Sequence, residues 1–482
     1  MTGILSYGVH LPVLRLSRAQ ILAAHGWYNP ALAPLATGER AICNWDEDAL
    51  TMAVEAARAA LTGGDHGGIA RVLLASTSLP YVERSGSAVL CEALGLETRV
   101  MPLDAGGSTR AGVATLLTAL QLDAASGATL CVASDDRPAR PASAQEMLFG
   151  AGAAAFVVGR GEAIATLRAV HSRTADFVDR LRAPTAHYGF QWEERWIRDG
   201  GHLGLLPETA LELLGQQRLT GADIQHLVLP LAQPQAARAV AKRIGVPAEC
   251  VVDTLYERSG DLGAALSSWL LVAALEKARP GERLLVCGFG QGCDALLLEA
   301  TDALPRVRTQ MTGVAAALAR RHAETNYMRY LVGSRQLDVE AGIRGEAQRP
   351  TAPSVAWRER RTVLGFQGGR CRRCGTVQFP AGAICVDPAC KAHGDMEPVG
   401  FAGRRGRILN CTADHLAASL RPPVHYGMVE FEGGGRVLLE FADTDAQPPQ
   451  AGMAVRMVFR LRRVDPVRQW RDYFWKATGV GA

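Results

Sequence analysis

The sequence repeats one pattern of short apolar segments and helices, and this repeat limits the folds that the chain can adopt. Equivalent segments lie roughly 140–155 residues apart, the sign of an internal duplication. In the first copy they are the strands 71–76, 101–104, 129–134 and 153–158 with the helix 110–125. In the second copy they are the strands 226–229, 250–253, 283–287 and 295–299 with the helices 236–244 and 263–277. Apolar strands that alternate with helices predict sheets covered on both faces, and two stacked halves predict an αβαβα arrangement.

The pattern also places the expected domain boundaries. The two halves of the duplication occupy residues 1–165 and 166–305, and a connector of helical character follows at 306–356. From Trp357 the composition shifts to cysteine, arginine and alternating apolar residues. We expect a cysteine-bearing segment at 357–400 and a small all-β domain at 401–482.

Composition narrows the class of protein. A chain of 482 residues suggests two or three domains, and 48% hydrophobic and 21% charged residues are ordinary for a globular protein. The net charge of +4 does not by itself imply nucleic acid. There is no apolar run of the ~18 residues that a membrane span needs, and the first residues lack the layout of a signal peptide. We therefore expect a cytoplasmic protein without a membrane partner.

Four of the 11 cysteines lie close together. Cys371 and Cys374 are separated by two residues and Cys385 and Cys390 by four, so the cluster offers two tight turns with two thiolates each. Four thiolates complete the tetrahedral coordination of Zn²⁺ and leave no position for water. We predict a structural zinc ion, in which Cys390, after the wider gap, is the least secure ligand.

Residues 104–120 combine the end of a strand, the turn Gly106-Gly107 and a long apolar helix. Backbone N–H groups at such a turn and helix N-terminus can bind an anion or a carbonyl oxygen. Ser108 and Thr109 stand where the helix begins, and a purely structural interpretation is that they N-cap it.

Several motifs in residues 3 to about 305 resemble archaeal and bacterial hydroxymethylglutaryl-CoA synthase-like proteins of the thiolase superfamily. These motifs are Gly38-Glu39-Arg40, residues 45–57, Asp176-Phe177 and residues 194–198. The Cys-x-x-Cys-Gly motif at 371–375 and Val377-Gln378-Phe379-Pro380 resemble the zinc ribbon and OB-fold that accompany many thiolase-like proteins. The resemblance implies an α/β thiolase-like fold of duplicated αβαβα halves, then a zinc ribbon (357–400) and an all-β OB-fold (401–482). It also implies a dimer or a higher assembly.

The catalytic positions that the resemblance implies carry other residues. The nucleophilic cysteine is replaced by Thr109, which follows Ser108, and the catalytic histidine by Ala232. Asp261 occupies the position of the asparagine, and the synthase glutamate corresponds, less securely, to Thr77. Because none of the catalytic residues is retained, relaxed or redirected chemistry is expected.

Elementary chemistry limits what this altered site can do. A threonine hydroxyl does not ionise near neutral pH and needs an adjacent base, whereas Ala232 offers none. Asp261 can accept a proton but cannot donate to an oxyanion unless it is protonated. Three histidines between the halves are candidates for a relocated base: His171, His187 and His202.

Cationic residues are candidates for binding CoA. Arg238, Lys242 and Arg243 lie on the helix after Gln235 and could pair with the phosphates of CoA, or could be a solvated helix face. The tail is rich in arginine, with the aromatic residues Trp470, Tyr473, Phe474 and Trp475 interleaved. Such a pattern suits CoA phosphates, stacking on single-stranded nucleic acid or an ordinary core, and the thiolase-like half favours CoA.

These inferences predict an acyl-CoA-binding, non-catalytic or weakly catalytic subunit of a thiolase or acyltransferase complex. The complex would make or break C–C bonds by Claisen or retro-Claisen chemistry, and the chain would form a homodimer or a hetero-oligomer with a catalytic thiolase subunit. One alternative is a self-sufficient condensing enzyme that uses Thr109 or Ser108 with a relocated base. Another, of a different class, is a nucleic-acid-binding or scaffold protein, although nucleic acid is the less favoured ligand.

Overall fold

A computed structural model describes residues 2–62, 68–340, 351–445, 447–465 and 467–480, and it divides into two compact units. Unit 1 comprises Met1–Ile42, Asp48–Ala88 and Thr98–Thr325, and unit 2 comprises Cys43–Glu47, Val89–Glu97 and Asn326–Ala482. Residues 341–350 of the expected connector lie outside the described residues. Within the described ranges, no helix is long and apolar enough to cross a membrane.

Unit 1 is built on nine strands whose order reflects the duplication. The first half contributes β5 (Met101–Ala105), β4 (Ile69–Ala75), β6 (Ala128–Asp136), β7 (Ala151–Arg160) and β1 (Thr2–His10), in this spatial order. The second half continues with β8 (Ala165–Thr174), β13 (Gly292–Ala300), β12 (Arg283–Phe289) and β11 (His226–Val228). In this sheet the two halves meet where β1 pairs with β8, Gly3 with Thr166 and Ile4 with Ala165.

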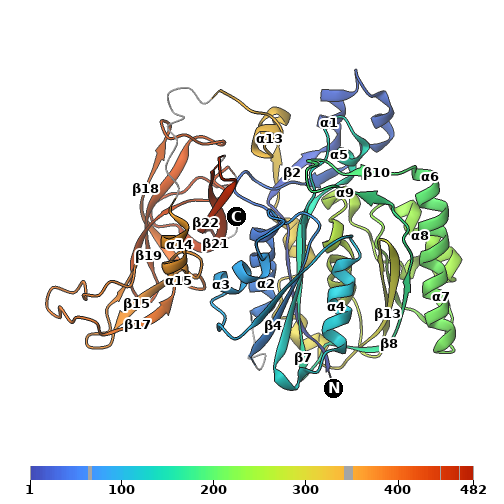
Figure 1. Cartoon of the computed structure of the whole chain (residues 1–482), viewed down its shortest axis with the longest axis horizontal. Helices are drawn as coiled ribbons and strands as arrows, with labels where there is room; N and C mark the ends of the chain where they lie inside the picture. The colour runs from blue at the N-terminus through green and yellow to red at the C-terminus, as the bar shows by residue number, and fades with distance from the viewer. Residues whose placement is uncertain (1, 63–67, 341–350, 446, 466, 481–482) are drawn as a thin grey trace. The chain divides into compact units, whose positions relative to one another are not determined.

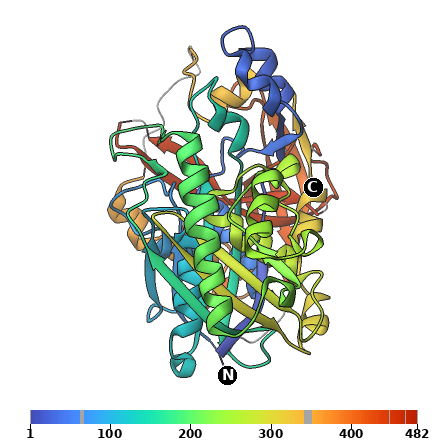
Figure 2. The same cartoon turned by 90° about the vertical axis from the view of Figure 1, so that its right-hand side faces the viewer.

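Helices cover both faces of each half (Figure 1). The helix α2 (Ala49–Leu61) packs on β1, β6 and β7, and α4 (Ala111–Gln121) and α10 (Leu266–Leu275) lie between the two sets of strands. On the far side α7 (Leu206–Gln216) and α8 (Pro234–Ile244) lie in front of the second set of strands in Figure 2. Every residue of α10 is buried, in agreement with its mostly apolar sequence. The predicted αβαβα thiolase-like fold is confirmed.

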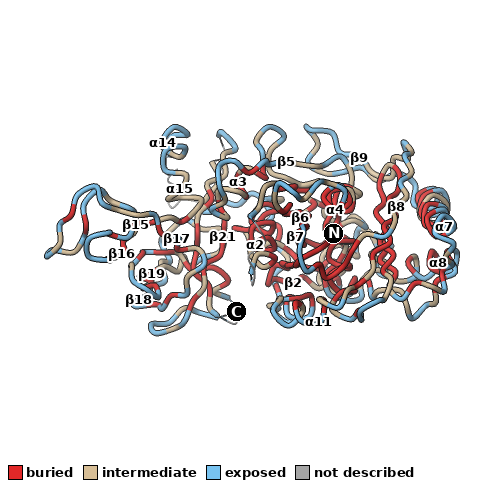
Figure 3. Tube along the Cα trace, turned by 90° about the horizontal axis from the view of Figure 1, so that it is seen from below, coloured by how far each residue is buried: buried red, intermediate tan, exposed pale blue. Residues whose placement is uncertain are grey.

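Burial follows these layers. Figure 3 shows the buried residues along β6, β7 and α4, and one apolar cluster includes Leu116 of α4, Trp269 of α10 and Phe156 of β7. The strand predicted at 250–253 is wrong. Val251 makes a single bridge to Leu227, because the chain then turns: the carboxylate of Asp253 accepts a hydrogen bond from the backbone N–H of Leu255, 3.0 Å away.

Unit 2 carries two small sheets. The first contains β16 (Val377–Gln378), β15 (Gln367–Cys371) and β17 (Met396–Gly400) in this order. The second contains β20 (Arg436–Glu440), β19 (Val424–Phe431), β18 (Gly406–Asp414), β21 (Ala454–Asp465) and β22 (Trp470–Gly479). This five-stranded antiparallel sheet is the all-β domain that the sequence predicts, with a tight turn between β19 and β20.

A buried ionic network ties the segment Cys43–Glu47 to the rest of unit 2. The guanidinium of Arg460 pairs with the carboxylates of Glu47 at 2.8 Å and Asp443 at 3.0 Å. The ammonium of Lys476 lies 3.0 Å from the carboxylate of Asp46. Because removal of one partner leaves a buried charge uncompensated, the pairs that Glu47 and Asp46 form fix the position of the segment.

The contact between α4 and the 3₁₀ turn Gly263–Ala265 predicts a strict requirement for glycine at position 112. A Cβ at Gly112 would lie 1.9 Å from the carbonyl oxygen of Ala264, so Gly112→Ala should lower the free energy of unfolding by at least about 1–3 kcal/mol. Gly215→Ala in α7 is the matched control, since a Cβ there meets nothing within 4 Å and alanine favours the helix by up to about 1 kcal/mol. Chemical denaturation of both variants checks this, and equal stabilities would contradict it.

Candidate functional site

The first turn of α4 is held by hydrogen bonds to the loop that follows β12. The hydroxyl of Ser108 donates to the carbonyl of Gly290 and that of Thr109 to the carbonyl of Phe289, each at 3.1 Å. No side chain caps α4, whose N-cap position is occupied by Arg110. The prediction that Ser108 and Thr109 N-cap the helix is therefore wrong. Their hydroxyls instead bind carbonyls of the second half of unit 1.

Arg110 strengthens this attachment. Its guanidinium binds both carboxylate oxygens of Asp294 in β13, with N–O distances of 2.7 Å. The same carboxylate accepts a hydrogen bond from the hydroxyl of Ser172 at 2.6 Å. Bidentate charge-assisted pairs fix geometry as well as charge, so the position of Thr109 is set by three consecutive side-chain contacts.

The hydroxyl of Thr109 donates to a backbone carbonyl. Among the described residues, no histidine or carboxylate accepts a hydrogen bond from the hydroxyl of Thr109 or Ser108. A backbone carbonyl accepts the hydrogen bond of each hydroxyl but cannot take up its proton. An alcohol in this setting is a poor nucleophile, because its activation requires a base within hydrogen-bond reach.

Asp261 lies in the loop that precedes the turn packed on α4, and two arginines surround its carboxylate. Arg137 pairs with it at 2.9 Å and Arg180 at 3.7 Å, and the backbone N–H of Gly263 donates to it at 3.0 Å. Burial raises the pKa of Asp261, but the charges of Arg137 and Arg180 outweigh this effect and the net pKa is lowered. Asp261 is thus ionised and paired, which makes it a weak proton acceptor and no proton donor.

The sequence alone did not single out Arg137 or Arg180. Arg137 follows the end of β6 and Arg180 stands in β9 (Arg180–Leu181), four residues after the Asp176 of a family-like motif. For Arg137 the sequence signal was a charged residue directly after a buried strand. For Arg180 it was the nearby motif that contains Asp176. Neither signal could reveal that both guanidiniums meet Asp261.

Of the three candidate histidines, only His202 lies near these groups. His202 stands in a π-helical segment, Ile197–Leu205, and its ring packs edge-on to that of Phe289 at 5.3 Å between centroids. Burial, followed by the charge of Arg180, lowers the pKa of His202 to about 4, although Asp261 opposes the shift. The imidazole is therefore neutral and weakly basic near pH 7.

The other two histidines, His171 and His187, contact other residues. The imidazole of His171 pairs with Glu212 of α7 at 2.8 Å, and His187 packs edge-on to Tyr188. Ala232 is half-buried and packs against the main apolar cluster of unit 1. At the position compared with the synthase glutamate, the hydroxyl of Thr77 donates to the carboxylate of Asp135 at 2.9 Å.

The predicted CoA-binding residues lie along α8, where they are exposed. Arg238 and Lys242 face solvent, and Arg243 donates to the carbonyl of Leu203 in the π-helical segment that carries His202. The charged face of α8 thus neighbours the element that brings His202 to the site. Binding of CoA phosphates by these residues stays a prediction.

Several of the arginines and aromatic residues of the tail make contacts within unit 2. Arg360 and Arg361 pair with Glu92, and Arg463 pairs with Asp472. Trp475 is fully buried and donates its indole N–H to the carbonyl of Leu364 at 2.7 Å. Trp475 therefore serves the core rather than a surface on which bases could stack.

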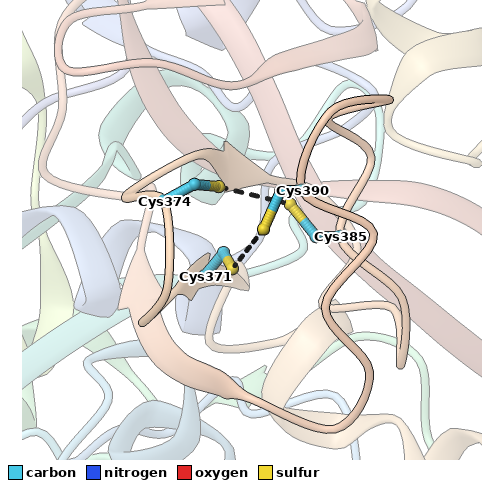
Figure 4. Close-up of side chains that lie close together, drawn as sticks. All are labelled: Cys371, Cys374, Cys385 and Cys390. Atoms are coloured by element: carbon cyan, nitrogen blue, oxygen red, sulfur yellow. Dashed lines mark hydrogen bonds between the residues drawn. The ribbon is translucent and has the colours of Figure 1, made fainter.

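The four clustered cysteines converge on one point (Figure 4). Their sulfur atoms all lie within 4.8 Å of one another, with 3.8 Å between Cys371 and Cys390 and 3.5 Å between Cys374 and Cys385. A tetrahedral zinc ion with Zn–S bonds of about 2.3 Å separates its sulfurs by about 3.8 Å. The cluster can hold a metal ion of this kind, and the wider spacing before Cys390 is closed by a turn around Asp387, whose carbonyl accepts from Cys390 N–H.

Comparison with known proteins agrees with this architecture. Residues 214–299 match the family described as 3-oxoacyl-[acyl-carrier-protein] synthase III C terminal, and residues 401–460 match the ChsH2 C-terminal OB-fold domain. The chain is 31% identical over 317 residues to a hydroxymethylglutaryl-CoA synthase of Thermococcus gammatolerans, covering 64% of this chain and 88% of that protein. It is 29% identical to the synthase of Pyrococcus horikoshii, covering 66% and 92%.

Solved structures show the same fold at lower identity. One of hydroxymethylglutaryl-CoA synthase complexed with CoA matches with a TM-score of 0.60 and 18% identity, covering 73% of this chain and 94% of that chain. One of 3-oxoacyl-(acyl carrier protein) synthase III from Pseudomonas aeruginosa matches with a TM-score of 0.56 and 22% identity, covering 62% and 98%.

The cysteine cluster generates a prediction about metal content. Elemental analysis of the purified chain should find one zinc per chain, and Cys371→Ser should abolish it and lower the melting temperature, because structural zinc contributes to folding. Cys411→Ser is the matched control, since Cys411 is an exposed cysteine on β18 outside the cluster. Full zinc content in Cys371→Ser would contradict the assignment.

His202 generates a prediction about pH. Its folded-state pKa of about 4 lies below the ordinary value of 6.5, so the unfolded chain takes up the proton first as pH falls. His202 should therefore reduce stability progressively between pH 6.5 and about 4, by up to about 3 kcal/mol in total. Unfolding of His202→Gln measured across this range should show a weaker loss than the wild type, whereas a variant of the exposed His187 should follow the wild type. Parallel curves for all three proteins would refute this.

Proposed function

The chain belongs to the hydroxymethylglutaryl-CoA synthase family of the thiolase superfamily, and from this membership we propose that it is an acyl-CoA-binding subunit without catalytic chemistry of its own. Its complex would make or break C–C bonds in acyl-CoA metabolism by Claisen or retro-Claisen chemistry. The chemistry would take place on a separate subunit with a thiolase cysteine.

The hydrogen bond of the Thr109 hydroxyl is the main support for this proposal. This hydroxyl donates to the carbonyl of Phe289, whereas acyl transfer requires a nucleophile that a neighbouring base can deprotonate. Asp261 is ionised and paired with Arg137 at 2.9 Å, so it offers neither a free base nor an oxyanion donor. A chain with this site can hold an acyl thioester more readily than it can attack one.

The remaining parts fit a binding role. The exposed cations of α8 would meet the phosphates of CoA, since guanidinium groups pair well with phosphate. A structural zinc ion on the four cysteines would order the ribbon, and this ribbon with the OB-fold would present the ligand or the partner. Thiolase-type folds assemble as dimers or larger oligomers, so we propose a homodimer or a hetero-oligomer with the catalytic subunit.

One observation favours an alternative in which the chain is itself a condensing enzyme. His202 stands next to Phe289, whose carbonyl binds Thr109, and could become a relocated base if the loop moved. Its pKa of about 4 weighs against this role, because efficient general bases have a pKa near the working pH.

Steady-state turnover tests the proposal. The isolated chain, incubated with acetoacetyl-CoA or acetyl-CoA, should release no CoA above the rate of the buffer, as followed with a thiol reagent. Binding of the same thioesters should be detectable by calorimetry. In a complex with its cysteine-bearing partner, Thr109→Ala should leave turnover within about twofold, because no bond to Thr109 forms. Turnover by the isolated chain that Thr109→Ala abolishes would support the alternative and refute the subunit proposal.

A further inference from the structure

We propose that a cavity within unit 2 binds the primary ammonium group of a small organic amine, and that it binds a diamine more tightly than a monoamine. All the residues that line this cavity belong to unit 2, whereas Thr109 belongs to unit 1. The amine site is therefore separate from the site of the proposed function and does not depend on an acyl-CoA ligand.

The cavity is small and is lined mostly by polar residues. Its volume of ≈ 30 Å³ is enough for about two water-sized groups, since each needs roughly 10–15 Å³, and an ammonium group is about as large as a water molecule. The lining comes from the segment Cys43–Glu47, from residues 419–425 and 440–445, and from Lys476 of β22. Four of the lining residues are carboxylates: Asp46, Glu440, Asp443 and Asp445.

Asp46 provides a buried acceptor that the chain leaves without a partner. Only 2% of Asp46 is exposed. Its Oδ2 pairs with the ammonium of Lys476 at 3.0 Å, whereas its Oδ1 has no hydrogen-bond partner among the described residues. The Nε of Arg460 is 3.9 Å from Oδ1, which is beyond hydrogen-bond distance. Because a buried acceptor without a partner is costly, Oδ1 favours a ligand that donates an N–H.

Two further carboxylates stand at the rim, where the cavity meets solvent. The side chains of Glu440 and Asp445 are 34% and 30% exposed. Glu440 pairs with Lys476 through Oε2 at 3.1 Å, and Asp445 pairs with Arg421 through Oδ2. Over the described ranges, no protein group donates a hydrogen bond to the second oxygen of either carboxylate. A second ammonium group at the rim would therefore meet two acceptors, which favours a diamine.

Asp443 is the weakest of the four acceptors. Its Oδ2 pairs with Arg460 at 3.0 Å. Burial raises the pKa of Asp443, and the charge of Arg460 does not cancel this shift because the carboxylates of Glu47 and Asp46 lie nearby. The charged form of Asp443 is thus disfavoured, and the other three carboxylates provide the acceptors for the ligand.

Lys476 shows how this part of unit 2 already holds an ammonium group. Its Nζ lies between the carboxylates of Asp46 and Glu440, and 4.4 Å from the centroid of the Trp45 ring. Burial lowers the pKa of His425 from its ordinary 6.5, so this lining histidine adds no positive charge near pH 7. A second ammonium group at Asp46 would be repelled by Lys476, and the rim carboxylates offset this repulsion.

The spacing of the carboxylates favours an organic cation over a metal ion. The oxygen ligands of Ca²⁺ lie about 2.3–2.6 Å from the ion, so two of them are at most about 5 Å apart. Across the part of the chain that the structure describes, only the four cysteines form a group of three or more possible metal ligands within 4.8 Å of one another. The more widely spread carboxylates suit the several N–H donors of an amine.

Isothermal titration calorimetry of the full-length, zinc-replete chain at constant ionic strength tests this. The probes are 1,4-diaminobutane, butylamine and tetramethylammonium, with MgCl₂ as the metal control. Butylamine should bind at least about tenfold more tightly than tetramethylammonium, because both carry one charge but only butylamine has N–H donors. The diamine should bind at one molecule per chain and more tightly than butylamine.

Substitutions of the acceptors locate the site. Asp46→Asn removes the charge of the buried acceptor and should weaken both amines about tenfold or more. Because Asp46 also pairs with Lys476, circular dichroism must show that this variant is folded. Glu440→Gln and Asp445→Asn at the exposed rim keep the test valid if it is not, and each should weaken the diamine about threefold or more and butylamine less.

Glu430→Gln is the matched control. Glu430 forms an exposed pair with Arg436 at 2.8 Å and does not line the cavity, so its variant should bind both amines like the wild type. Equal affinity for butylamine and tetramethylammonium would reduce the effect to charge screening and overturn the site. Binding of Mg²⁺ without binding of amines, amine binding that the acceptor variants leave unchanged, or no saturable amine binding would overturn it as well.

Discussion

The close approach of Gly112 to the carbonyl of Ala264 is the constraint on which the site of this protein depends. It allows α4 to lie directly against the loop of the second half that carries Asp261. The bidentate pair between Arg110 and Asp294 joins the start of α4 to β13 of the second half. Because both contacts cross between the halves, the duplication creates one shared site that neither half contains alone.

At this site the chain has the fold of its family. The hydroxyl of Thr109, which the sequence comparison sets at the nucleophile position, donates to the carbonyl of Phe289, and Asp261 pairs with Arg137. Buried ion pairs contribute little to stability on balance, but loss of one partner is costly.

The sequence predicted the layers because apolar periodicity depends on local spacing. It predicted the cysteine cluster because paired cysteines with two or four residues between them can meet in tight turns. It failed at 250–253, where the carboxylate of Asp253 turns the chain after a single bridge. It also missed Arg137, which follows β6, and Arg180 of β9, because both lie far from Asp261 in the sequence. Burial and neighbouring charge distinguish His202 from His171, and both depend on tertiary packing that residue spacing does not record.

The central claim is that no acyl group becomes attached to this chain. Intact-mass measurement of the zinc-replete protein after incubation with short and aromatic acyl-CoAs tests it most directly, because an ester on a hydroxyl adds the mass of the acyl group and survives removal of free CoA. The account predicts an unchanged mass together with measurable acyl-CoA binding. An adduct that maps to Thr109 or Ser108 would contradict it and would show that the site has regained a nucleophile.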